Sequence, residues 1–254
     1  KYSIKLIAMF KILNILLLTT GMAYSQSSDL LFNDGNEYYN NNQFNDAIKA
    51  YESILNKGFY SADLYYNLGN AYYRLDDFAN ARWSYEMGII KDPRNKDILH
   101  NLVLTKQKIP NTLEIPDSQI LNMINNFLAS FTYGDFIFFS SLMLLFYSIS
   151  LTLYRITLST YSVGLYYCFM FLFFLGTSCS VIKFLWQENN IFGIILNDET
   201  QLYSAPFLND DIKISLFFSG NKVKIEQTTD KWLEISSMDG RKGWIRLEDI
   251  RTLE

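Results

Sequence analysis

The sequence contains few of the residues that metal binding, disulfide formation and nucleophilic catalysis require. It has two cysteines and a single histidine, His100, with no Ser-centred elbow and no Gly-rich phosphate loop. Cys168 and Cys179 lie in one apolar run, about 16 Å apart if that run is helical, so they cannot pair with each other. We therefore expect no bound metal, no cofactor and no enzyme activity.

A basic excess is also missing. The chain has 22 Lys and Arg against 26 Asp and Glu, a formal net charge of −4, and no basic stripe runs along it. Nucleic acid is therefore excluded as an expected partner. With 49% hydrophobic and 17% aromatic residues, the 254-residue chain is too apolar for a disordered protein. It has room for two or three small domains.

Residues 1–25 have the composition of an export signal. Lys1, Lys5 and Lys11 precede a short apolar run, Ile12 to Leu18, and Ala23-Tyr24-Ser25 offers small residues at positions −3 and −1. The run falls short of the roughly 20 residues that span a bilayer. An uncleaved N-terminal anchor is the alternative, and either reading predicts that the following region is exported.

Residues 28–109 contain a repeat of 34 residues. Five residues recur at this spacing: Gly35 as Gly69, Tyr38 as Tyr72, Phe44 as Phe78, Ala47 as Ala81 and Tyr51 as Tyr85. This period is typical of helix–turn–helix units that bury their apolar faces by stacking. The second unit, which Pro93 closes, resembles the tetratricopeptide repeat family at every signature position, whereas the first departs at Asp34 and Phe59. The resemblance implies an α-solenoid of two units, with a capping helix that starts near Asn95.

The same resemblance implies that the first helix of each unit lines a concave, partner-binding face. The matching residues are Phe32, Asn36, Tyr39 and Asn40 in the first unit and Tyr66, Asn70, Tyr73 and Arg74 in the second. Gly35-Asn36 and Gly69-Asn70 match repeats that clamp a C-terminal carboxylate. However, Phe32 and Tyr66 stand where that clamp has lysine. We therefore expect an aromatic, hydrogen-bonding groove for a peptide segment, with packing between helices as the alternative role for each tyrosine.

Residues 110–134 are expected to form a linker and one amphipathic helix. Pro110 and Pro116 break the preceding helix. From Ser118 to Phe131 the apolar residues follow a helical spacing, and the opposite face is rich in asparagine. This pattern predicts a helix that lies at a membrane surface or packs on the solenoid.

Residues 135–183 predict two transmembrane helices. No charged residue occurs from Phe136 to Tyr154 or from Ile156 to Ile182, and Arg155 alone separates these stretches. Each stretch is long enough to span a bilayer, with a tight loop around Arg155 to Tyr161. Four aromatic residues have the positions of interfacial belts: Tyr133, Tyr154, Tyr161 and Trp186.

Residues 194–254 predict a small antiparallel β domain of about five strands. Val223 and Ile225 alternate with polar residues, as do Leu233 and Ile235. The elements Gly220-x-x-Val223, Trp232-x-x-Ile235, Asp239-Gly240-Arg241 and Gly243-Trp244-Ile245 resemble the bacterial SH3 domain family, which implies an SH3-like all-β barrel. We expect Trp232 and Trp244 in its core or at its rim. The acidic pairs Asp210-Asp211 and Glu248-Asp249 are expected in solvated turns.

The order of these segments resembles the BatE-like tetratricopeptide-repeat family of the Bacteroides aerotolerance operon. This resemblance implies a non-enzymatic, membrane-anchored scaffold in an inner-membrane complex linked to aerotolerance or stress response. The implied partners are von Willebrand factor A-type membrane proteins and a MoxR-type ATPase system. The alternative is a cell-envelope receptor that binds peptidoglycan through the SH3-like domain. An export signal followed by two spans predicts a multi-pass protein of the bacterial inner membrane, with both soluble domains in the periplasm.

Overall fold

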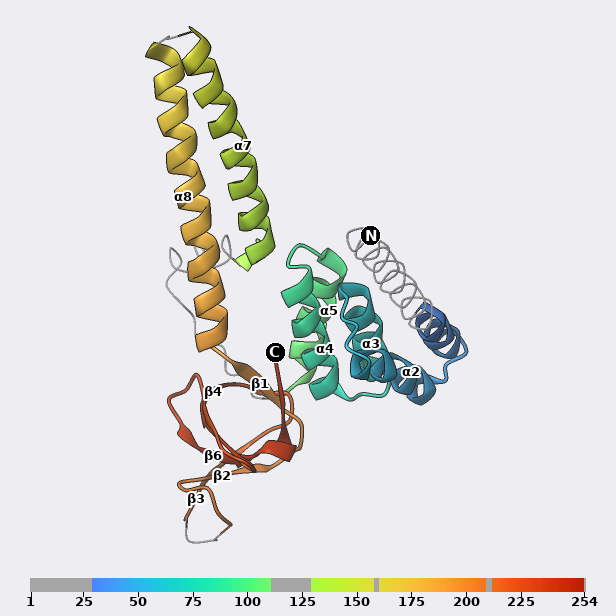
Figure 1. Cartoon of the computed structure of the whole chain (residues 1–254). Coiled ribbons are helices and arrows are strands. Elements are labelled where there is room, and N and C mark those ends of the chain that lie inside the picture. Colours follow the sequence, from blue (N-terminus) through green and yellow to red (C-terminus); the bar gives the residue numbers. More distant parts are fainter. Residues whose placement is uncertain (1–28, 111–128, 158–159, 209–211, 254) are drawn as a thin grey trace, which may run out of the picture.

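A computed structural model describes residues 29–110, 129–157, 160–208 and 212–253 (Figure 1). These residues form an array of helices, a pair of long apolar helices and an antiparallel sheet. The predicted export signal, nearly all of the predicted amphipathic helix and the pair Asp210-Asp211 lie outside the described residues.

The helical array begins with a helix over residues 29–40 and continues with four helices that pack on one another in chain order. Their bounds are α2 Phe44–Asn56, α3 Ala62–Arg74, α4 Phe78–Lys91 and α5 Lys96–Lys108. Side chains of Ser61, Asp77 and Asn95 accept backbone hydrogen bonds at the starts of α3, α4 and α5. The helix expected to start near Asn95 is therefore present, and Asn95 is its N-cap.

Two glycines explain the close approach of neighbouring helices in the array. A Cβ atom added at Gly35 would lie 2.5 Å from the ring of Tyr51, and one added at Gly69 would lie 2.6 Å from the ring of Tyr85. Both tyrosines are about 1% exposed. Each ring therefore packs directly against the backbone of the neighbouring helix. The glycine and tyrosine that recur after 34 residues make the same contact in both places.

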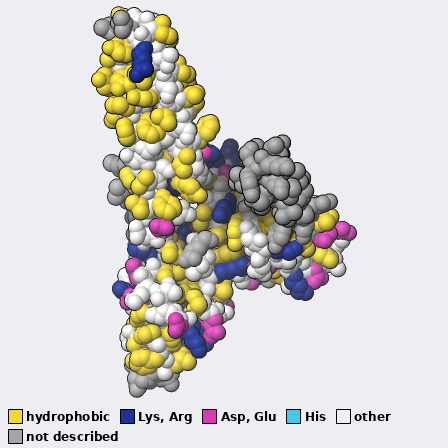
Figure 2. Space-filling model, in the orientation of Figure 1, with side chains coloured by type: hydrophobic (Ala, Val, Ile, Leu, Met, Phe, Trp, Pro, Cys, Tyr) yellow, Lys and Arg dark blue, Asp and Glu magenta, His cyan; other side chains and the backbone are white. Residues whose placement is uncertain are grey.

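The long helices α7 (Tyr133–Thr157) and α8 (Thr160–Asn189) pack against each other along their length (Figure 1). Their most apolar windows have mean hydropathies of 2.0 and 1.9, and only 17% and 11% of those windows is buried inside the protein. Figure 2 shows hydrophobic side chains over the visible surface of the pair. These helices are long and apolar enough to cross a membrane, and their low burial differs from that of core helices.

The β domain is a seven-stranded antiparallel sheet with strand order β3-β2-β6-β5-β4-β1-β7. The strands are β1 Phe192–Ile195, β2 Thr200–Tyr203, β3 Lys213–Phe217, β4 Lys222–Thr228, β5 Trp232–Ser236, β6 Lys242–Arg246 and β7 Ile250–Thr252. Val223, Leu233, Ile235 and Ile245 are buried in its core, as the alternation predicts. There are more strands than expected, because β1 and the short β7 pair with each other beside β4.

One expectation about the β domain is wrong. Asp249, predicted to be solvated, is only 5% exposed. Its carboxylate accepts hydrogen bonds from the Asn197 amide at 2.8 Å and from Arg246 Nε at 3.0 Å, whereas the neighbouring side chain of Glu248 is 69% exposed. The short 3-10 helix Leu247–Asp249 turns the two carboxylates to different sides, so only one of them stays in solvent.

A polar contact joins the helical array to the last strand. The indole Nε1 of Trp83 donates to the carbonyl oxygen of Thr252 at 2.6 Å. The guanidinium of Arg251 lies 3.4 Å from the centre of a Trp83 ring and donates to both carboxylate oxygens of Glu52, at 2.8 and 3.0 Å. Both hydrogen bonds come from Nη2, so Arg251 joins the Trp83 ring on α4 to the Glu52 carboxylate on α2.

A second polar contact lies between α4 and the β3–β4 turn. Arg82, which is 4% exposed, donates from Nη1 to the carbonyl oxygen of Gly220 at 2.9 Å. Lys222 Nζ lies 2.7 Å from Glu86 Oε2. Burial opposes ionisation of Glu86, but Lys222 and Arg82 outweigh it and lower the pKa of that carboxyl group. The array and the sheet are therefore fixed together by buried, charge-assisted contacts.

Candidate functional site

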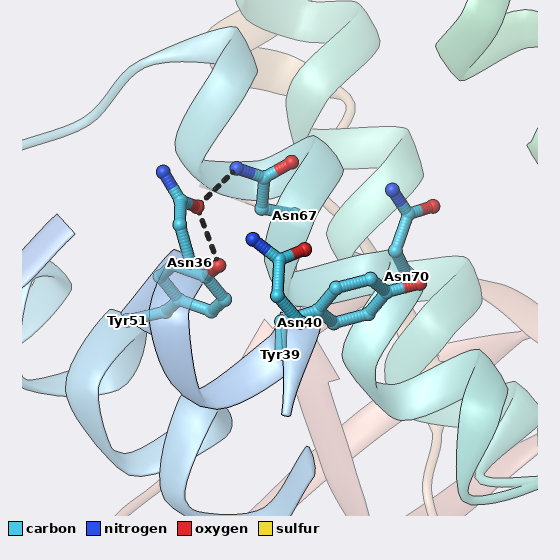
Figure 3. A pocket seen from close by; sticks show the side chains of 6 residues that line it. All are labelled: Asn36, Tyr39, Asn40, Tyr51, Asn67 and Asn70. Carbon is cyan, nitrogen blue, oxygen red and sulfur yellow. Dashed lines mark hydrogen bonds between the residues drawn. The ribbon is translucent and has the colours of Figure 1, made fainter. Parts of the chain in front are cut away.

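A cleft of about 310 Å³ opens in the helical array between the helix over residues 29–40 and α3 (Figure 3). Its lining consists of four asparagines and two tyrosines: Asn36, Tyr39, Asn40, Tyr51, Asn67 and Asn70. These side chains offer hydrogen-bond donors and acceptors together with aromatic surface, and none of them carries a formal charge at neutral pH. The cleft is therefore suited to a polar, uncharged ligand surface.

A hydrogen-bond network of three side chains forms one wall of the cleft. Asn36 Oδ1 accepts from the Tyr51 hydroxyl at 2.7 Å and from Asn67 Nδ2 at 2.9 Å, and both bonds are drawn in Figure 3. The network joins the helix over residues 29–40 to α2 and α3. It therefore fixes the position of Asn36 before any ligand arrives.

The same network recurs one repeat later. Asn70 Oδ1 accepts from the Tyr85 hydroxyl at 2.7 Å and from Asn101 Nδ2 at 2.8 Å. All three members differ by 34 positions from those of the first network. A ladder of two equivalent amide and phenol networks thus runs through the array, and α5 supplies its last member.

Burial controls the protonation of the two phenols in this ladder. Burial, with a smaller contribution from Tyr39, raises the pKa of Tyr51 to about 12. Burial also raises the pKa of Tyr85. Both hydroxyls therefore remain protonated donors at neutral pH, which suits them for structural hydrogen bonds rather than for proton abstraction.

Several amide groups that line the cleft are available to hydrogen-bond a ligand. The exposed side chain of Asn40 has no hydrogen-bond partner among the described residues, and in that part of the chain Asn36 Nδ2 and Asn67 Oδ1 have none either. Figure 3 shows the amides of Asn40, Asn67 and Asn70 around the opening. The opening therefore offers both hydrogen-bond donors and acceptors, which the N–H and C=O groups of a peptide backbone require.

The structure brings together only some of the residues predicted to bind a partner. Asn36, Tyr39 and Asn70 line the cleft, whereas four others lie outside its lining: Phe32, Tyr66, Tyr73 and Arg74. Phe32 contacts Tyr51 with ring centres 6.0 Å apart, and Tyr66 contacts Tyr85 in the equivalent way at 6.4 Å. These ring contacts correspond to the packing alternative for the aromatic positions.

Tyr39 and Tyr73 also make equivalent contacts across their own units. The ring centres of Tyr39 and Phe44 are 5.3 Å apart, and those of Tyr73 and Phe78 are 5.4 Å apart, both edge-on. The exposed Arg74 places its guanidinium 4.7 Å from the centre of the Phe44 ring, between the two units. Tyr39 therefore has two roles, since it packs on α2 and also lines the cleft.

Sequence reasoning missed Tyr51 and Asn67 as lining residues. The 34-residue pattern marks Tyr51 as a recurring residue, and Asn67 recurs in the same way as Asn101. The recurrence of an asparagine outside the repeat signature was the available signal. An amide that recurs at a half-buried helical position needs a recurring partner, and Asn36 and Asn70 are those partners.

A second candidate surface lies on the outer face of the sheet. Tyr203 on β2 pairs with Trp244 on β6, and the ring of Tyr203 lies 5.4 Å from that of Trp232 on β5, edge-on. Both tryptophans are half-buried, so neither belongs to the buried core of the sheet. Glu234 is opposite Trp244 and Arg246 is opposite Trp232, so polar groups border the aromatic row.

The sequence matches no protein-family model, and no curated protein matches it either. Among the described residues, no three His, Cys, Asp or Glu side chains gather where they could hold a metal ion. The functional assignment therefore depends on the cleft, the aromatic row and the contacts between the folded parts.

Proposed function

We propose that this protein is a non-enzymatic, membrane-anchored scaffold that binds an extended segment of a partner protein in the Asn/Tyr cleft. The helical array is taken as two tetratricopeptide units with a capping helix, and the sheet as an SH3-like barrel. The observation that carries the proposal is the repeated Asn–Tyr–Asn network, which holds amide groups in place around an open cleft.

A peptide backbone fits this cleft better than a charged group does. Asn36, Asn40 and Asn67 provide both amide donors and carbonyl acceptors, which match the N–H and C=O groups of an extended chain. No lysine or arginine lines the cleft, so a terminal carboxylate would have no cation to pair with. We therefore propose an internal segment of the partner as the ligand.

The proposed location is a bacterial inner membrane, with α7 and α8 as the two spans and both soluble parts in the periplasm. The contacts of Trp83 with Thr252 and of Glu86 with Lys222 support this arrangement. Two parts that touch must lie on the same side of the membrane, and an even number of crossings returns the chain to that side. The predicted export signal makes that side the periplasm.

The proposed partners are von Willebrand factor A-type membrane proteins that act with a MoxR-type ATPase system in aerotolerance or stress response. Support for this class comes from the order of the segments, which resembles the BatE-like family. The neutral cleft and the two spans are compatible with a scaffold that collects other membrane proteins.

Affinity purification of the full chain tests the cleft. The variant Asn40→Ala removes a side chain that supports nothing else in the described part of the chain, and Gln107→Ala is the matched control on the exposed face of α5. Purification after mild solubilisation should recover less partner with Asn40→Ala and an unchanged amount with Gln107→Ala. Equal recovery with both variants would remove the cleft as the binding site.

The second candidate function, a peptidoglycan-binding receptor, is favoured by the aromatic row. Flat sugar rings stack on half-exposed tryptophan and tyrosine faces, and Glu234 and Arg246 supply polar groups beside them. The full chain in detergent would be sedimented with purified peptidoglycan. Co-sedimentation that Trp244→Ala abolishes would support the receptor, whereas the absence of co-sedimentation would leave the scaffold.

A further inference from the structure

One edge of the helical array lies beside the start of α7. The guanidinium of Arg94, in the turn between α4 and α5, is 3.4 Å from the carboxylate of Asp135 and 5.9 Å from the centre of the Phe131 ring. Asp135 is the third residue of α7. In Figure 1 the α4–α5 turn lies next to the base of the α7–α8 pair. If α7 spans the bilayer as proposed, this edge of the array is at the level of the lipid headgroups.

The side chains at this edge are basic and aromatic. Lys91 and Lys96 flank the α4–α5 turn and are exposed, and Lys57 is exposed in the neighbouring α2–α3 turn. Lys91 Nζ lies 5.4 Å from the centre of the Tyr60 ring, and Tyr60 is 56% exposed. An amphipathic ring beside ammonium groups is the combination that favours a membrane–water interface.

The ends of α7 and α8 at this level carry aromatic residues as well. Tyr133 opens α7 and is 49% exposed, and Trp186 lies near the end of α8 and is 60% exposed. The hydroxyl of Ser180 donates to the carbonyl oxygen of Tyr133, so the start of α7 lies beside α8 about two turns before Trp186. Tyr60 therefore extends an aromatic belt that the two proposed spans already provide.

Four acidic residues share this edge, and one of them, Asp135, pairs with Arg94. Asp63 and Asp97 lie in the first turns of α3 and α5, where free backbone N–H groups and the helix dipole stabilise negative charge. Asp92 accepts a hydrogen bond from the backbone N–H of Arg94 at 3.2 Å. Lys57, Lys91 and Lys96 remain exposed toward the proposed headgroup layer.

We propose that this edge binds the phosphate groups of anionic phospholipids through Lys57, Lys91 and Lys96, with Tyr60 at the interface. The proposal rests on the membrane placement of α7 and α8. Lipid binding would hold the array against the bilayer and leave its cleft open to a partner in the same membrane. Because Debye screening weakens surface charge, the contact should weaken as salt rises.

The test uses the full chain in lipid nanodiscs. After Cys168→Ser and Cys179→Ser, a nitroxide label is placed through Asn56→Cys at the end of α2 beside this edge. The matched control is Asn41→Cys, in the turn that precedes the start of α2. Collisional relaxation by a nickel-chelating lipid headgroup reports how close each label lies to the membrane surface. Discs of phosphatidylcholine alone are compared with discs that also contain phosphatidylglycerol.

We expect strong relaxation at Asn56→Cys in phosphatidylglycerol discs, weak relaxation at Asn41→Cys, and loss of the phosphatidylglycerol effect in a Lys57→Gln/Lys91→Gln/Lys96→Gln variant. Equal relaxation in both lipids, or at both labels, would overturn the proposal, as would a lysine variant that behaves like the parent. If the ligand of this edge is an acidic protein instead, the relaxation should be equal in the two lipids, which also overturns the proposal.

A separate measurement distinguishes failure of the membrane placement. Extraction of membranes at alkaline pH leaves a protein with two spans in the membrane and releases a peripheral one. A chain that resists extraction but shows no lipid effect contradicts only the headgroup contact. A chain that is extracted contradicts both the proposed spans and the contact that rests on them.

Discussion

At the scale of single residues, Asn36 and Asn70 serve the structure before they serve a partner. Each uses its carbonyl oxygen to accept two hydrogen bonds, from a buried tyrosine on the next helix and from an asparagine on the helix after that. Asn40, one turn further along, makes none among the described residues and is exposed. Similar side chains in one cleft therefore have separable roles, and substitution separates them.

Asn70→Ala should destabilise the array. It leaves the Tyr85 hydroxyl and Asn101 Nδ2 without their acceptor, and an unsatisfied buried polar group costs about 1–3 kcal/mol. The free energy of unfolding, measured by thermal or chemical denaturation, should fall by that amount. For Asn40→Ala we expect a change within about 0.5 kcal/mol. Equal effects of the two substitutions would contradict the separation of roles.

Gly69→Ala should also destabilise the array. The new Cβ would lie 2.6 Å from a ring atom of the fully buried Tyr85, so the ring or the helix must move, at a cost of about 1–3 kcal/mol. Gly164→Ala in α8 is the control, because no atom lies within 4 Å of its added Cβ. A Gly69→Ala protein with an unchanged melting temperature would show that the Tyr85 ring is not packed as described.

At the scale of elements, α4 has buried residues on several of its faces, and the sequence pattern does not predict this. Arg82, Trp83 and Ser84 are all buried, although arginine and serine are usually exposed. Their environment comes from residues far along the chain: Gly220 is 138 positions from Arg82, and Thr252 is 169 positions from Trp83. The helix itself was predictable from its repeat, but its contact with the sheet was not, because nothing local records such partners.

Lys222→Met should weaken the contact between α4 and the sheet. Glu86 would lose its closest cation and keep Arg82, whose Nε is 3.6 Å away, together with the attraction of Lys106. Removal of one partner from a largely buried ion pair costs up to about 3–5 kcal/mol. Thermal unfolding of the full chain should shift to lower temperature. Lys224→Met, on the same strand, is the control, because Lys224 pairs only with the partly exposed Glu226 at 3.6 Å. Equal shifts would contradict a special role for Glu86.

The pH dependence of this contact follows from the lowered pKa of Glu86. A carboxyl group whose pKa is lower in the folded state stabilises that state above its ordinary pKa, and this stabilisation is lost as pH falls through the folded value. The free energy of unfolding of the wild-type chain should therefore fall as the pH drops below about 4–5, the ordinary range of a glutamate pKa. In Glu86→Gln that part of the acid sensitivity should disappear, and an unchanged acid profile would exclude Glu86 as its source.

At the scale of the whole molecule, the contacts between the array and the sheet require a shared side of the proposed membrane. The two apolar helices were predictable from the long uncharged stretches, and the structure lengthens them to Tyr133–Thr157 and Thr160–Asn189. The loop predicted around Arg155 to Tyr161 is wrong, because both of these residues lie within the helices. The alternation of Val223 and Ile225 likewise predicted buried strand positions. The cleft was only partly predictable, because its outline depends on Tyr51 and Asn67, which meet Asn36 from two other helices.

Cysteine labelling tests the shared side. Single cysteines at Asn56 and Met238, both exposed, should react with a membrane-impermeant reagent added to the periplasmic face, after Cys168 and Cys179 are replaced by serine. A cysteine at Ser159, between α7 and α8, should be protected. Labelling of only one of the first two positions would mean that the array and the sheet lie on opposite sides, and the contacts between them could not exist in the membrane.

Site-specific photocrosslinking from position 40 tests the central claim, that the Asn/Tyr cleft holds an extended partner segment. A photoreactive residue replaces Asn40 in the full chain in living cells, and a second chain carries it at Gln107 as the control. The account predicts a covalent adduct from position 40 alone, in which the crosslinked peptide comes from an internal segment of another membrane protein. Identical adducts from both positions, or none from position 40 under conditions in which the complex is recovered, would contradict it.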